Sequence, residues 1–582
     1  MKLSDYVMSY LREIGVTTIF GYQGSSISHV IDSLHKTKGL KYIQNNHEQA
    51  SAFSANAYSQ VSGALGVALS CSGPGATNLI TGIANAYFDS LPCLFITGQV
   101  GLSGIRTNRN VRQQGFQETD IVSIAGPITK FSVAIMRAED IRYNLEKAVY
   151  VAQQGRPGPV LIDIPHNIQN MDVTPETLSS FFTSEEFRRS ITSSPEIHDS
   201  VIEHVYKIFE CSKRPVLLLG GGCSRLKGSG LIETFISQCH IPVVASLKGL
   251  DIVSHHHECF SGFIGAYGNR YANFCVACSD ALLVLGSRLD PMQTGGNVQE
   301  FARHSTIVHV DVDIHELQKL DRNKVNILCD VKVFIERMLS MFDKKPIVAD
   351  RWLSTVNRWR NKYPSGTKAK AHYVDPNEFI VALDRHLTED AIVCCDVGLN
   401  QMWVAQSIVL NGKRSLVTSG GHGAMGYSLP AAIGAFLVSM NRQVICIVGD
   451  GGVQMNSQEL HTIAKEHIPA KIFILNNASL GMIRMYQQRV FGGNTYGSVA
   501  GFSSPDYRKI ADAYGFSYAK IASMTEFRVC AGNLQTTEPC ICEVLIDPML
   551  EANPRPAYNK PVADQDPPLD REEYEQIVNC FA

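Results

Sequence analysis

The sequence has 582 residues, of which 45% are hydrophobic and 18% are charged, and its formal net charge is −3. This near-neutral balance argues against a nucleic-acid partner bound by bulk charge, and no apolar run is long enough to predict a membrane-spanning helix. A chain of this length is too long for one hydrophobic core, so three or four domains of about 100–200 residues are expected.

Sixteen cysteines are many for such a chain. Most, such as Cys446, stand inside apolar runs, where a reduced thiol packs as a small hydrophobe. A CxxC ending at Cys278 and a CxC ending at Cys542 each lack a second pair at zinc-site spacing. The amino terminus lacks the apolar core of a signal peptide. Together these patterns predict a cytoplasmic protein with reduced, buried thiols.

Residues 1–170 are predicted to form an α/β domain, because helical patterns alternate with short apolar strands. The helical pattern is clearest at residues 2–14. Parallel strands are predicted at residues 18–20, 40–43, 66–70, 94–99 and 159–165.

A polar linker is predicted at residues 171–190, followed by a second α/β domain at 190–345 and a third at 370–550. The remaining residues, 551–582, are rich in Pro, Asp and Glu, which predicts an extended surface tail. The expected fold class is therefore α/β, with three doubly wound parallel-sheet domains. Strands of the second domain are predicted at residues 214–219, 281–286 and 307–313.

Residues 448–482 hold the most informative pattern. One apolar run leads into Gly449-Asp450-Gly451-Gly452, and a second leads into Asn476-Asn477-Ala478-Ser479. A helical pattern between them completes a βαβ unit, and the carboxyl ends of parallel strands are where α/β sheets bind ligands. Asp450 and Asn477 offer hard oxygen ligands with little charge. This suits Mg²⁺, which takes its other ligands from phosphate and water.

A GDG opening and an NN closing resemble the thiamine diphosphate motif, in which a divalent ion ties the diphosphate to the protein. Gly-Asp-Gly alone is typical of a simple turn, but the whole string with a strand before each end is a much stronger signal. Several motifs in the same order identify the chain as a member of the FAD-containing acetolactate synthase family, large-subunit-like. The resemblance implies pyrimidine-binding, central FAD-binding and diphosphate-binding domains, and it makes Asp450, Asn477 and Ser479 the Mg²⁺ ligands.

Thiamine chemistry needs a carboxylate that hydrogen-bonds the aminopyrimidine ring, so that the ring can take the thiazolium proton. Glu48 matches the family's glutamate, whereas outside this context a Glu after a strand is an ordinary surface charge. In the family this glutamate reaches the cofactor of the partner subunit, which implies a homodimer or homotetramer. Gly24, Phe116 and Gln117 match residues near the reacting carbon and the substrate.

The resemblance also implies cofactor contacts in glycine-rich loops, where the backbone can approach a ligand closely. Residues 420–426 resemble the family's GxGAMG loop, and Met482 matches the apolar residue that wedges the cofactor into a bent form. The implied contacts are Pro74, Asn78, Val397, Gly398, Asn400, Gly423, Met425, Gly449, Gly451, Gly452 and Met482.

Glycine clusters in the second domain resemble the flavin-binding version of the family. Each cluster alone is a weak signal, since relatives without flavin keep the same domain, but together they predict FAD. Decarboxylation followed by carboligation involves no net redox change, so FAD would be largely structural. The implied FAD contacts are Arg156, Gly220, Gly221, Gly222, Gly265, Gly286, Arg288, Asp311 and Asp330.

Three positions in the pocket for the second substrate depart from the family pattern. Met292 stands where the family has an arginine for the acceptor's carboxylate, Tyr486 replaces a tryptophan and His166 replaces a lysine; Met482 completes this acceptor pocket. Losing one charge-assisted contact costs about 1.5–3 kcal/mol, which weakens binding by about one to two orders of magnitude.

These departures favour a carboligase that decarboxylates pyruvate and transfers the two-carbon unit to an acceptor other than a simple 2-keto acid. A nucleotide-linked keto-deoxysugar used in surface polysaccharide synthesis is one such acceptor. Acetolactate synthase proper, with a repositioned cation, is the nearest alternative. A flavin-linked pyruvate oxidase and a non-catalytic relative are further alternatives. Arg484 is interpreted equally well as a phosphate or hydroxyl contact and as a solvated helix charge.

Overall fold

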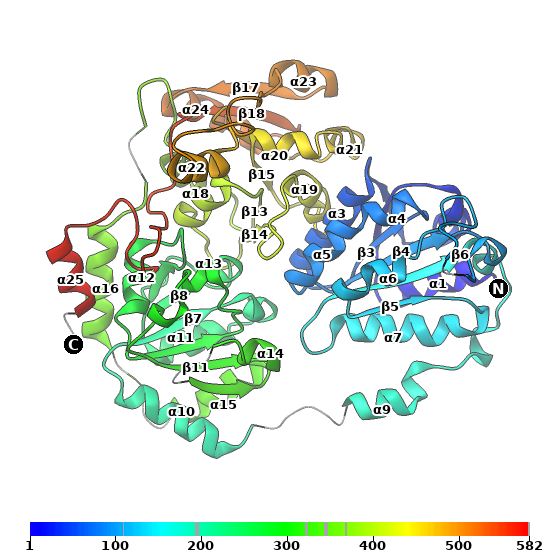
Figure 1. Ribbon diagram of the computed structural model, residues 1–582, viewed down its shortest axis with the longest axis horizontal. Coiled ribbons are helices and arrows are strands. Elements are labelled where there is room, and N and C mark those ends of the chain that lie inside the picture. Colours follow the sequence, from blue (N-terminus) through cyan, green and yellow to red (C-terminus); the bar gives the residue numbers. More distant parts are fainter. Residues whose placement is uncertain are drawn as a thin grey trace.

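Parallel sheets organise all three parts of the chain. In this computed structural model, every neighbouring pair of strands in three six-stranded sheets is parallel, and helices lie on both faces of each sheet (Figure 1). The expected fold class is therefore confirmed. The structure describes all residues except 109, 192–196, 321–323, 343–346, 348, 367–368 and 580–582.

The first sheet has the strand order β2-β1-β3-β4-β6-β5. All five strands predicted for this part of the chain are present, and the edge strand β5 was missed because it is short and only half-buried. The strands are β1 (Thr18–Gly21), β2 (Lys41–Gln44), β3 (Gly66–Ser70), β4 (Cys93–Gln99), β5 (Phe131–Ala134) and β6 (Pro159–Pro165). The helices are α1 (Leu3–Glu13), α2 (Ser28–Lys36), α3 (Glu48–Ser62), α4 (Pro74–Asn78), α5 (Ile80–Phe88), α6 (Ile121–Ala125), α7 (Ile141–Gln153), α8 (His166–Gln169) and α9 (Glu185–Ile191).

The second sheet has the order β12-β11-β10-β7-β8-β9. Read from its other edge, this is the doubly wound order of dinucleotide-binding domains. The strands are β7 (Pro215–Leu219), β8 (Val243–Ala245), β9 (Phe260–Phe263), β10 (Ala281–Leu285), β11 (Thr306–Asp311) and β12 (Lys324–Leu328). The helices are α10 (Asp199–Cys211), α11 (Leu231–Cys239), α12 (Arg270–Ala277), α13 (Pro291–Thr294), α14 (Ile314–Leu317), α15 (Val331–Phe342) and α16 (Asp350–Lys362).

The third sheet, β14-β13-β15-β16-β18-β17, repeats the connectivity of the first. Its central strands are apolar and buried along nearly their whole length, as expected for a sheet covered on both faces. The strands are β13 (Ile392–Cys395), β14 (Ser415–Val417), β15 (Val444–Gly449), β16 (Lys471–Asn476), β17 (Ser517–Ile521) and β18 (Cys540–Leu545). The helices are α17 (Pro376–Asp384), α18 (Leu399–Ser407), α19 (Ser428–Phe436), α20 (Asp450–Met455), α21 (Glu459–Lys465), α22 (Gly481–Val490), α23 (Tyr507–Tyr514) and α24 (Met524–Cys530), and α25 (Arg571–Asn579) follows in the C-terminal tail.

The first and third domains share one hydrophobic core through α3 and α19. The backbones come so close that a Cβ added at Gly434 would lie 2.0 Å from the Ser54 carbonyl oxygen. Next to this contact, the rings of Phe53 and Tyr427 meet edge to face at 5.2 Å. Small residues on both helices therefore set how the two domains pack.

A buried carboxylate joins all three domains. Asp89, at the end of α5, accepts hydrogen bonds from the backbone N–H groups of Gly420 and Gly421 at 3.0 and 2.7 Å. It also accepts one from Lys248 Nζ at 3.2 Å, and this ammonium group donates to the carbonyl of Thr418 as well. These contacts fix the position of the glycine loop after β14.

The prediction of an extended surface tail was wrong for the described residues after 550. Gln565 is almost fully buried, and its Nε2 donates to the carbonyl oxygen of Gly268 at 2.9 Å. Arg270 Nη2 donates to the Pro567 carbonyl at 2.7 Å, and the tail ends in α25 beside α16 and α12 (Figure 1). Proline and charged residues can therefore pack against a domain when their backbone groups find partners there.

Fifteen cysteines of the described chain are free thiols, and most of them are buried. None of the described helices is both long enough and apolar enough to cross a membrane.

Candidate active site

The two ends of the 448–482 pattern lie at one edge of the third sheet. β15 and β16 are neighbours, with Gly449 opposite Leu475. Asp450 follows β15 as the first residue of α20, and Asn477 follows β16 directly. The expected helix between them is present as α21, preceded by α20. The predicted βαβ unit is confirmed.

Asp450 is a buried carboxylate, 2% exposed. Burial raises the pKa of Asp450 to about 6, and a hydrogen bond from Ser504 Oγ (3.1 Å) acts in the opposite direction. The N–H of Gly451 donates to its other oxygen at 3.1 Å, and the Tyr507 hydroxyl donates to the Asp450 carbonyl at 3.2 Å. The side chain is thus held in place by neutral donors, which leave its charge uncompensated.

A tight turn presents the second group of oxygens. The side chain of Asn476 accepts from the Ala478 N–H at 3.0 Å and donates to Glu543 Oε1 at 2.7 Å. Ala478 has a φ of 51°, in the left-handed region that costs a non-glycine residue energy and is common at functional sites. In this turn Asn477 is 5% exposed, and the buried Ser479 Oγ has no hydrogen-bond partner among the described residues.

This donor set fits a magnesium ion. One carboxylate, one amide and one buried hydroxyl that lacks a partner are hard oxygen donors with a single negative charge. The described residues contain no group of three or more His, Cys, Asp or Glu placed to hold a metal. A cation bound here would therefore need oxygens from a ligand such as a diphosphate.

Asp396, which was not among the predicted site residues, holds the surrounding glycine loops together. It is fully buried and accepts from the N–H groups of Gly426 at 3.0 Å and Ser428 at 2.9 Å. A Cβ added at Gly452 would lie 2.8 Å from its Oδ1. Burial raises the pKa of Asp396, and these hydrogen bonds lower it. The sequence signal that could have identified Asp396 is its position at the end of an apolar strand, just before Val397.

The implied diphosphate loops converge around this carboxylate. Gly398 precedes α18 with a φ of 133°, and Asn400 Oδ1 would lie 3.2 Å from a Cβ at Gly449. A Cβ at Gly451 would lie 2.4 Å from Leu480 and 3.5 Å from Met425, so the two ends of the pattern and the GxGAMG-like loop are in contact.

Two further implied contacts lie beside these loops. Gly423 has a φ of 69°, and a Cβ added there would meet no atom within 4 Å. Met482, at the start of α22, accepts a hydrogen bond on sulfur from the Tyr267 hydroxyl at 3.0 Å.

Glu48 lies in the first domain, at the start of α3. Its carboxylate is 8% exposed, and its Oε2 accepts from Asn78 Nδ2 at 3.0 Å. A Cβ added at Gly75 would lie 3.0 Å from its Oε1, so α4, which Pro74 opens, closes over the carboxylate without filling the space beside it. Glu48 is therefore buried, and Asn78 is its one polar side-chain partner among the residues that the structure describes.

The other predicted residues of the first domain surround this carboxylate less tightly. A Cβ at Gly24 would lie 2.7 Å from Cys71 Sγ, and one at Gly73 would lie 2.8 Å from the Gln117 side chain. Gln117 has a φ of 65°, and Phe116 is 86% exposed. An apolar ring that is so exposed lacks a partner from its own described chain.

The structure brings three of the four predicted acceptor-pocket residues to one region. The Ala266 N–H donates to the Met292 carbonyl at 2.7 Å, and the next residue, Tyr267, contacts Met482. Met292 and Tyr486 have side chains that are 55% and 47% exposed.

The fourth acceptor-pocket residue lies elsewhere. His166 is in the first domain, with its ring 4.6 Å from that of His29.

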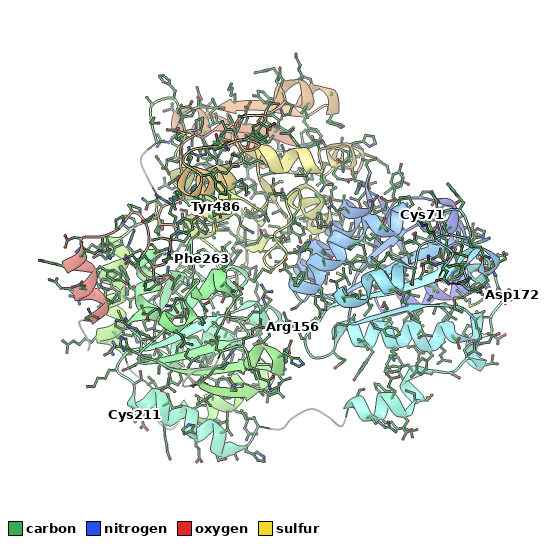
Figure 2. The ribbon with its side chains drawn as sticks, viewed as in Figure 1. Cys71, Arg156, Asp172, Cys211, Phe263 and Tyr486 are labelled. Atoms are coloured by element: carbon green, nitrogen blue, oxygen red, sulfur yellow. The ribbon has the colours of Figure 1, made fainter. Side chains whose placement is uncertain are left out.

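In Figure 2, Cys71, near Glu48, and Tyr486 lie well apart on different domains.

Both interpretations of Arg484 are corrected. The side chain is 1% exposed, so it is not a solvated charge. Its Nη2 donates to the carbonyl of Leu550 at 2.7 Å and its Nη1 contacts Met549 Sδ, so it packs under the segment after β18.

The second sheet forms a glycine cradle where its strand order reverses, between β7 and β10. Gly220 and Gly222 pack against Gly286, and a Cβ at Gly220 would lie 2.2 Å from the Gly286 oxygen. Gly286 has a φ of 57°, and Gly265, with a φ of 114°, lies against the Met292 carbonyl. Backbone without side chains at a switch point fits a dinucleotide such as FAD.

The charged residues near this cradle have varied partners. Arg156 donates to Asp313 at 2.9 Å and to Glu316 at 2.7 Å, so it bridges the first and second domains. Burial raises the pKa of Asp311, at the end of β11, to about 6.

Two other predicted FAD contacts, and the middle glycine of the 220–222 cluster, lie close by. Arg288 Nη1 donates to the Phe88 carbonyl at 3.3 Å, and Asp330 is exposed at the end of β12. A Cβ at Gly221 would lie 3.1 Å from Lys248.

Three protein-family descriptions match separate parts of the chain. These are the thiamine pyrophosphate enzyme N-terminal TPP binding domain over residues 1–124, the central domain over 202–338, and the C-terminal TPP binding domain over 396–544. Each match falls on one of the three sheets.

Several relatives are similar over most of their length. The acetolactate synthase large subunit of Lactococcus lactis subsp. lactis (strain IL1403) is 35% identical over 549 residues, 93% of this chain and 92% of that protein. The acetolactate synthase large subunit of Pyropia yezoensis is 38% identical over 511 residues, 86% of this chain and 84% of its own. Acetolactate synthase 2, chloroplastic, of Nicotiana tabacum is 34% identical over 557 residues, which are 94% of this chain and 82% of that protein.

Proposed function

The chain belongs to the thiamine diphosphate-dependent acetolactate synthase family of C–C bond-forming enzymes, and we propose that it decarboxylates pyruvate and joins the two-carbon unit to a second carbonyl compound. One observation carries this proposal. Asp450, Asn477 and Ser479 stand at the ends of two neighbouring parallel strands, surrounded by glycine loops that converge on Asp396. This is the donor set that a metal-bound diphosphate requires.

Thiamine diphosphate, when bound, supplies the electron sink for decarboxylation of a 2-keto acid. The protein's own residues position it. Asp450, Asn477 and Ser479 would hold Mg²⁺, and the backbones at Gly398, Gly423 and the Gly449 loop would approach the cofactor, because no side chains stand in the way.

Glu48 is the residue to which we assign proton handling. Its buried carboxylate would hydrogen-bond the aminopyrimidine ring and exchange a proton with it, while Asn78 fixes its orientation through Oε2. A single neutral partner leaves the other oxygen available. Phe116 and Gln117 would line the substrate side of this carboxylate.

FAD is the second proposed cofactor. Gly220, Gly222 and Gly286 would hold it at the switch point of the second sheet, with Arg288 and Asp311 at the rim. Its role in this reaction would be structural. Three domains at 1–170, 190–345 and 370–550 would then each bind a different part of the cofactor set.

A homodimer or homotetramer is the proposed assembly. Glu48 and Phe116 belong to the first domain, whereas Met482 and Tyr486 belong to the third. In Figure 2, Tyr486 lies well apart from Cys71, which like Glu48 lies next to Gly75. Phe116 and Tyr486 are both exposed. A partner subunit would bring the two half-sites together, and the cytoplasm is the proposed location.

Two acceptors are compatible with the proposed site. The names of the relatives support a second 2-keto acid, and hence acetolactate, better than the altered acceptor that the substitutions suggested. The exposed Met292, which carries no charge to pair with a carboxylate, is the observation that keeps a ketone acceptor as the second candidate.

Incubation of the purified protein with pyruvate, thiamine diphosphate, Mg²⁺ and FAD separates these candidates. Formation of acetolactate at an enzymatic rate would support the first candidate and reject the altered acceptor. Pyruvate consumed only after a keto-sugar nucleotide is added would support the second. Absence of decarboxylation with either acceptor would contradict the proposed function, and reduction of a quinone or oxygen would indicate an oxidase.

A further inference from the structure

A pocket of about 270 Å³ lies where the second domain meets the third. None of the residues assigned above to cofactors, metal or substrate lines it. Its walls come from β9, from α16 and from the carboxyl end of α18. Figure 2 labels Phe263, one of these wall residues, at the border between the two domains. The volume of the pocket is just below the usual range for small-molecule sites, about 300–1,000 Å³.

The walls of this pocket combine polar side chains, among them Asn269 and Gln406, with a buried apolar surface. Phe260, Phe263 and Ile408 are each 5% exposed. The ring of His255 stacks on Phe260 at 4.0 Å, and its two nitrogens lie 2.8 and 3.1 Å from the carbonyl oxygens of Leu250 and Ile408. Burial lowers the pKa of His255 to about 4, and the two carbonyl oxygens act in the opposite direction. The side chains of Phe260, Phe263 and Ile408 therefore offer an apolar surface to a group about the size of a branched alkyl chain.

One cation lines the pocket without a counter-charge. Arg360, in the last turn of α16, is exposed, and its Nη1 donates to the Phe260 carbonyl at 3.3 Å. Among the described residues no carboxylate lies within 4.0 Å of its guanidinium group, and none of the lining residues is acidic. An arginine beside an apolar pocket favours a ligand with a carboxylate at one end.

The pocket also lies against one end of α18, whose other end reaches the loops proposed to hold the diphosphate. Ala405 and Ser407, in the last turn of α18, line the pocket. At the other end, Gly398 precedes the helix, and Asn400, in its first turn, lies against Gly449. A ligand that packs against the last turn of α18 would therefore contact the element that positions the diphosphate loop.

We propose that this pocket binds a small monocarboxylate with a branched apolar body, and that its occupation changes the affinity for thiamine diphosphate through α18. The carboxylate pairs with Arg360, and the apolar body fills the space between Phe263 and Ile408. The coupling rests on the proposed cofactor, whereas the binding site does not.

Calorimetric titration of the full-length protein with isovalerate tests the site. Isovalerate is expected to bind, and Arg360→Gln is expected to weaken binding by about two- to fivefold, since an ion pair at an exposed arginine is screened by water. Arg358→Gln is the matched control, because Arg358 is exposed on the same helix and does not line the pocket. No binding of isovalerate, or equal binding of uncharged isoamyl alcohol or of isovalerate to Arg360→Gln, would overturn the site.

The coupling is tested by fluorescence titration with thiamine diphosphate and Mg²⁺, with and without isovalerate. A change of about fivefold or more in the half-saturating cofactor concentration is expected in the wild type and not in Arg360→Gln. An unchanged value in the wild type would overturn the coupling. Failure of thiamine diphosphate to bind at all would instead contradict the proposed function.

Discussion

The first and third sheets share one strand order, yet different residues stand at their equivalent edges. In both, the chain order reverses between the first and third strands of the domain, where α/β sheets bind ligands. The third sheet presents Gly398 and Asp450 at this point, and the first presents Gly24 and Cys71. A carboxylate suited to a metal is thus found in only one of the two.

The carboxylate of the first domain comes from a helix. Glu48 opens α3 after the edge strand β2, and its partner is the amide of Asn78. Asp450 instead follows a central strand and is fixed by Ser504 and backbone donors. Two copies of one framework therefore offer different chemistry, because function depends on the residues at the strand ends and not on the fold.

The largest effect is expected from Asp450→Asn. It removes the carboxylate of the proposed magnesium site. The loss of several kcal/mol of metal-linked stabilisation is expected to lower the rate by about a thousandfold or more. Acetolactate formation measured against Mg²⁺ concentration tests this. Asp512→Asn, at an exposed position on α23, is the control. Normal Mg²⁺-dependent turnover in Asp450→Asn would refute the metal assignment.

Glu48→Gln is expected to lower kcat by about 10²–10⁴-fold, the usual contribution of proton transfer by a positioned side chain. The affinity for Mg²⁺ should stay the same, because the metal side is intact. Steady-state kinetics and cofactor titration measure both. Glu13→Gln, exposed at the end of α1, is the matched variant. If the affinity for Mg²⁺ fell together with kcat, the assignment of metal binding to the third domain alone would be wrong.

Glu543→Gln sharpens the comparison from the third-domain side. The carboxylate of Glu543 accepts from both Asn476 and the Tyr518 hydroxyl, so it holds the turn that carries Asn477. A glutamine cannot accept in the same way from both, and Mg²⁺ affinity should fall by about tenfold, as for other partners of metal ligands.

Asn78→Ala is the counterpart in the first domain. It should lower kcat by about tenfold, since Glu48 loses the hydrogen bond from the Asn78 side chain, and it should leave Mg²⁺ affinity unchanged. Titration of both variants with Mg²⁺ measures the difference. Equal losses of Mg²⁺ affinity in this variant and in Glu543→Gln would contradict the assignment of metal binding to the third domain alone.

The smallest expected effect concerns stability and pH. Asp163 lies in β6, the strand equivalent to β18, and accepts from Thr97 at 2.6 Å and Gln99 at 3.0 Å. Burial raises the pKa of Asp163 from 3.8 to about 7. The folded state therefore keeps a proton that the unfolded chain has lost, so stability falls as pH rises between these values.

The slope attributable to Asp163 reaches at most about 1.4 kcal/mol per pH unit. Thermal midpoints of the wild type and Asp163→Asn, compared from pH 5 to pH 8, measure it. The variant should lose less stability than the wild type as pH rises. Parallel curves would show that Asp163 does not titrate in this range.

Local pattern was enough to predict five of the six strands of the first sheet, strands β7, β10 and β11 of the second, and the βαβ unit around Asp450 in the third. In an α/β chain, long apolar runs that end in glycines are compatible with few structures other than buried strands. The edge strand β5 escaped prediction because four half-buried residues carry little periodicity.

Tertiary contacts decided the remaining features, and no local pattern encodes them. Arg484 was interpreted from its charge, but the segment after β18 covers it. The tail around Gln565 is polar in composition and still packs against the second domain. Asp396 organises three loops that are far apart in sequence, so its importance is visible only once the loops are placed together.

Subunit complementation tests most directly the claim that each site combines Glu48 of one chain with Asp450 of another. Glu48→Gln and Asp450→Asn are each expected to be inactive alone. After they are mixed, dissociated and reassociated, hybrid dimers would contain one intact site, and random pairing restores about a quarter of wild-type activity. No recovery, with hybrids demonstrated by mass spectrometry, would place both residues of a site in one chain and contradict this account.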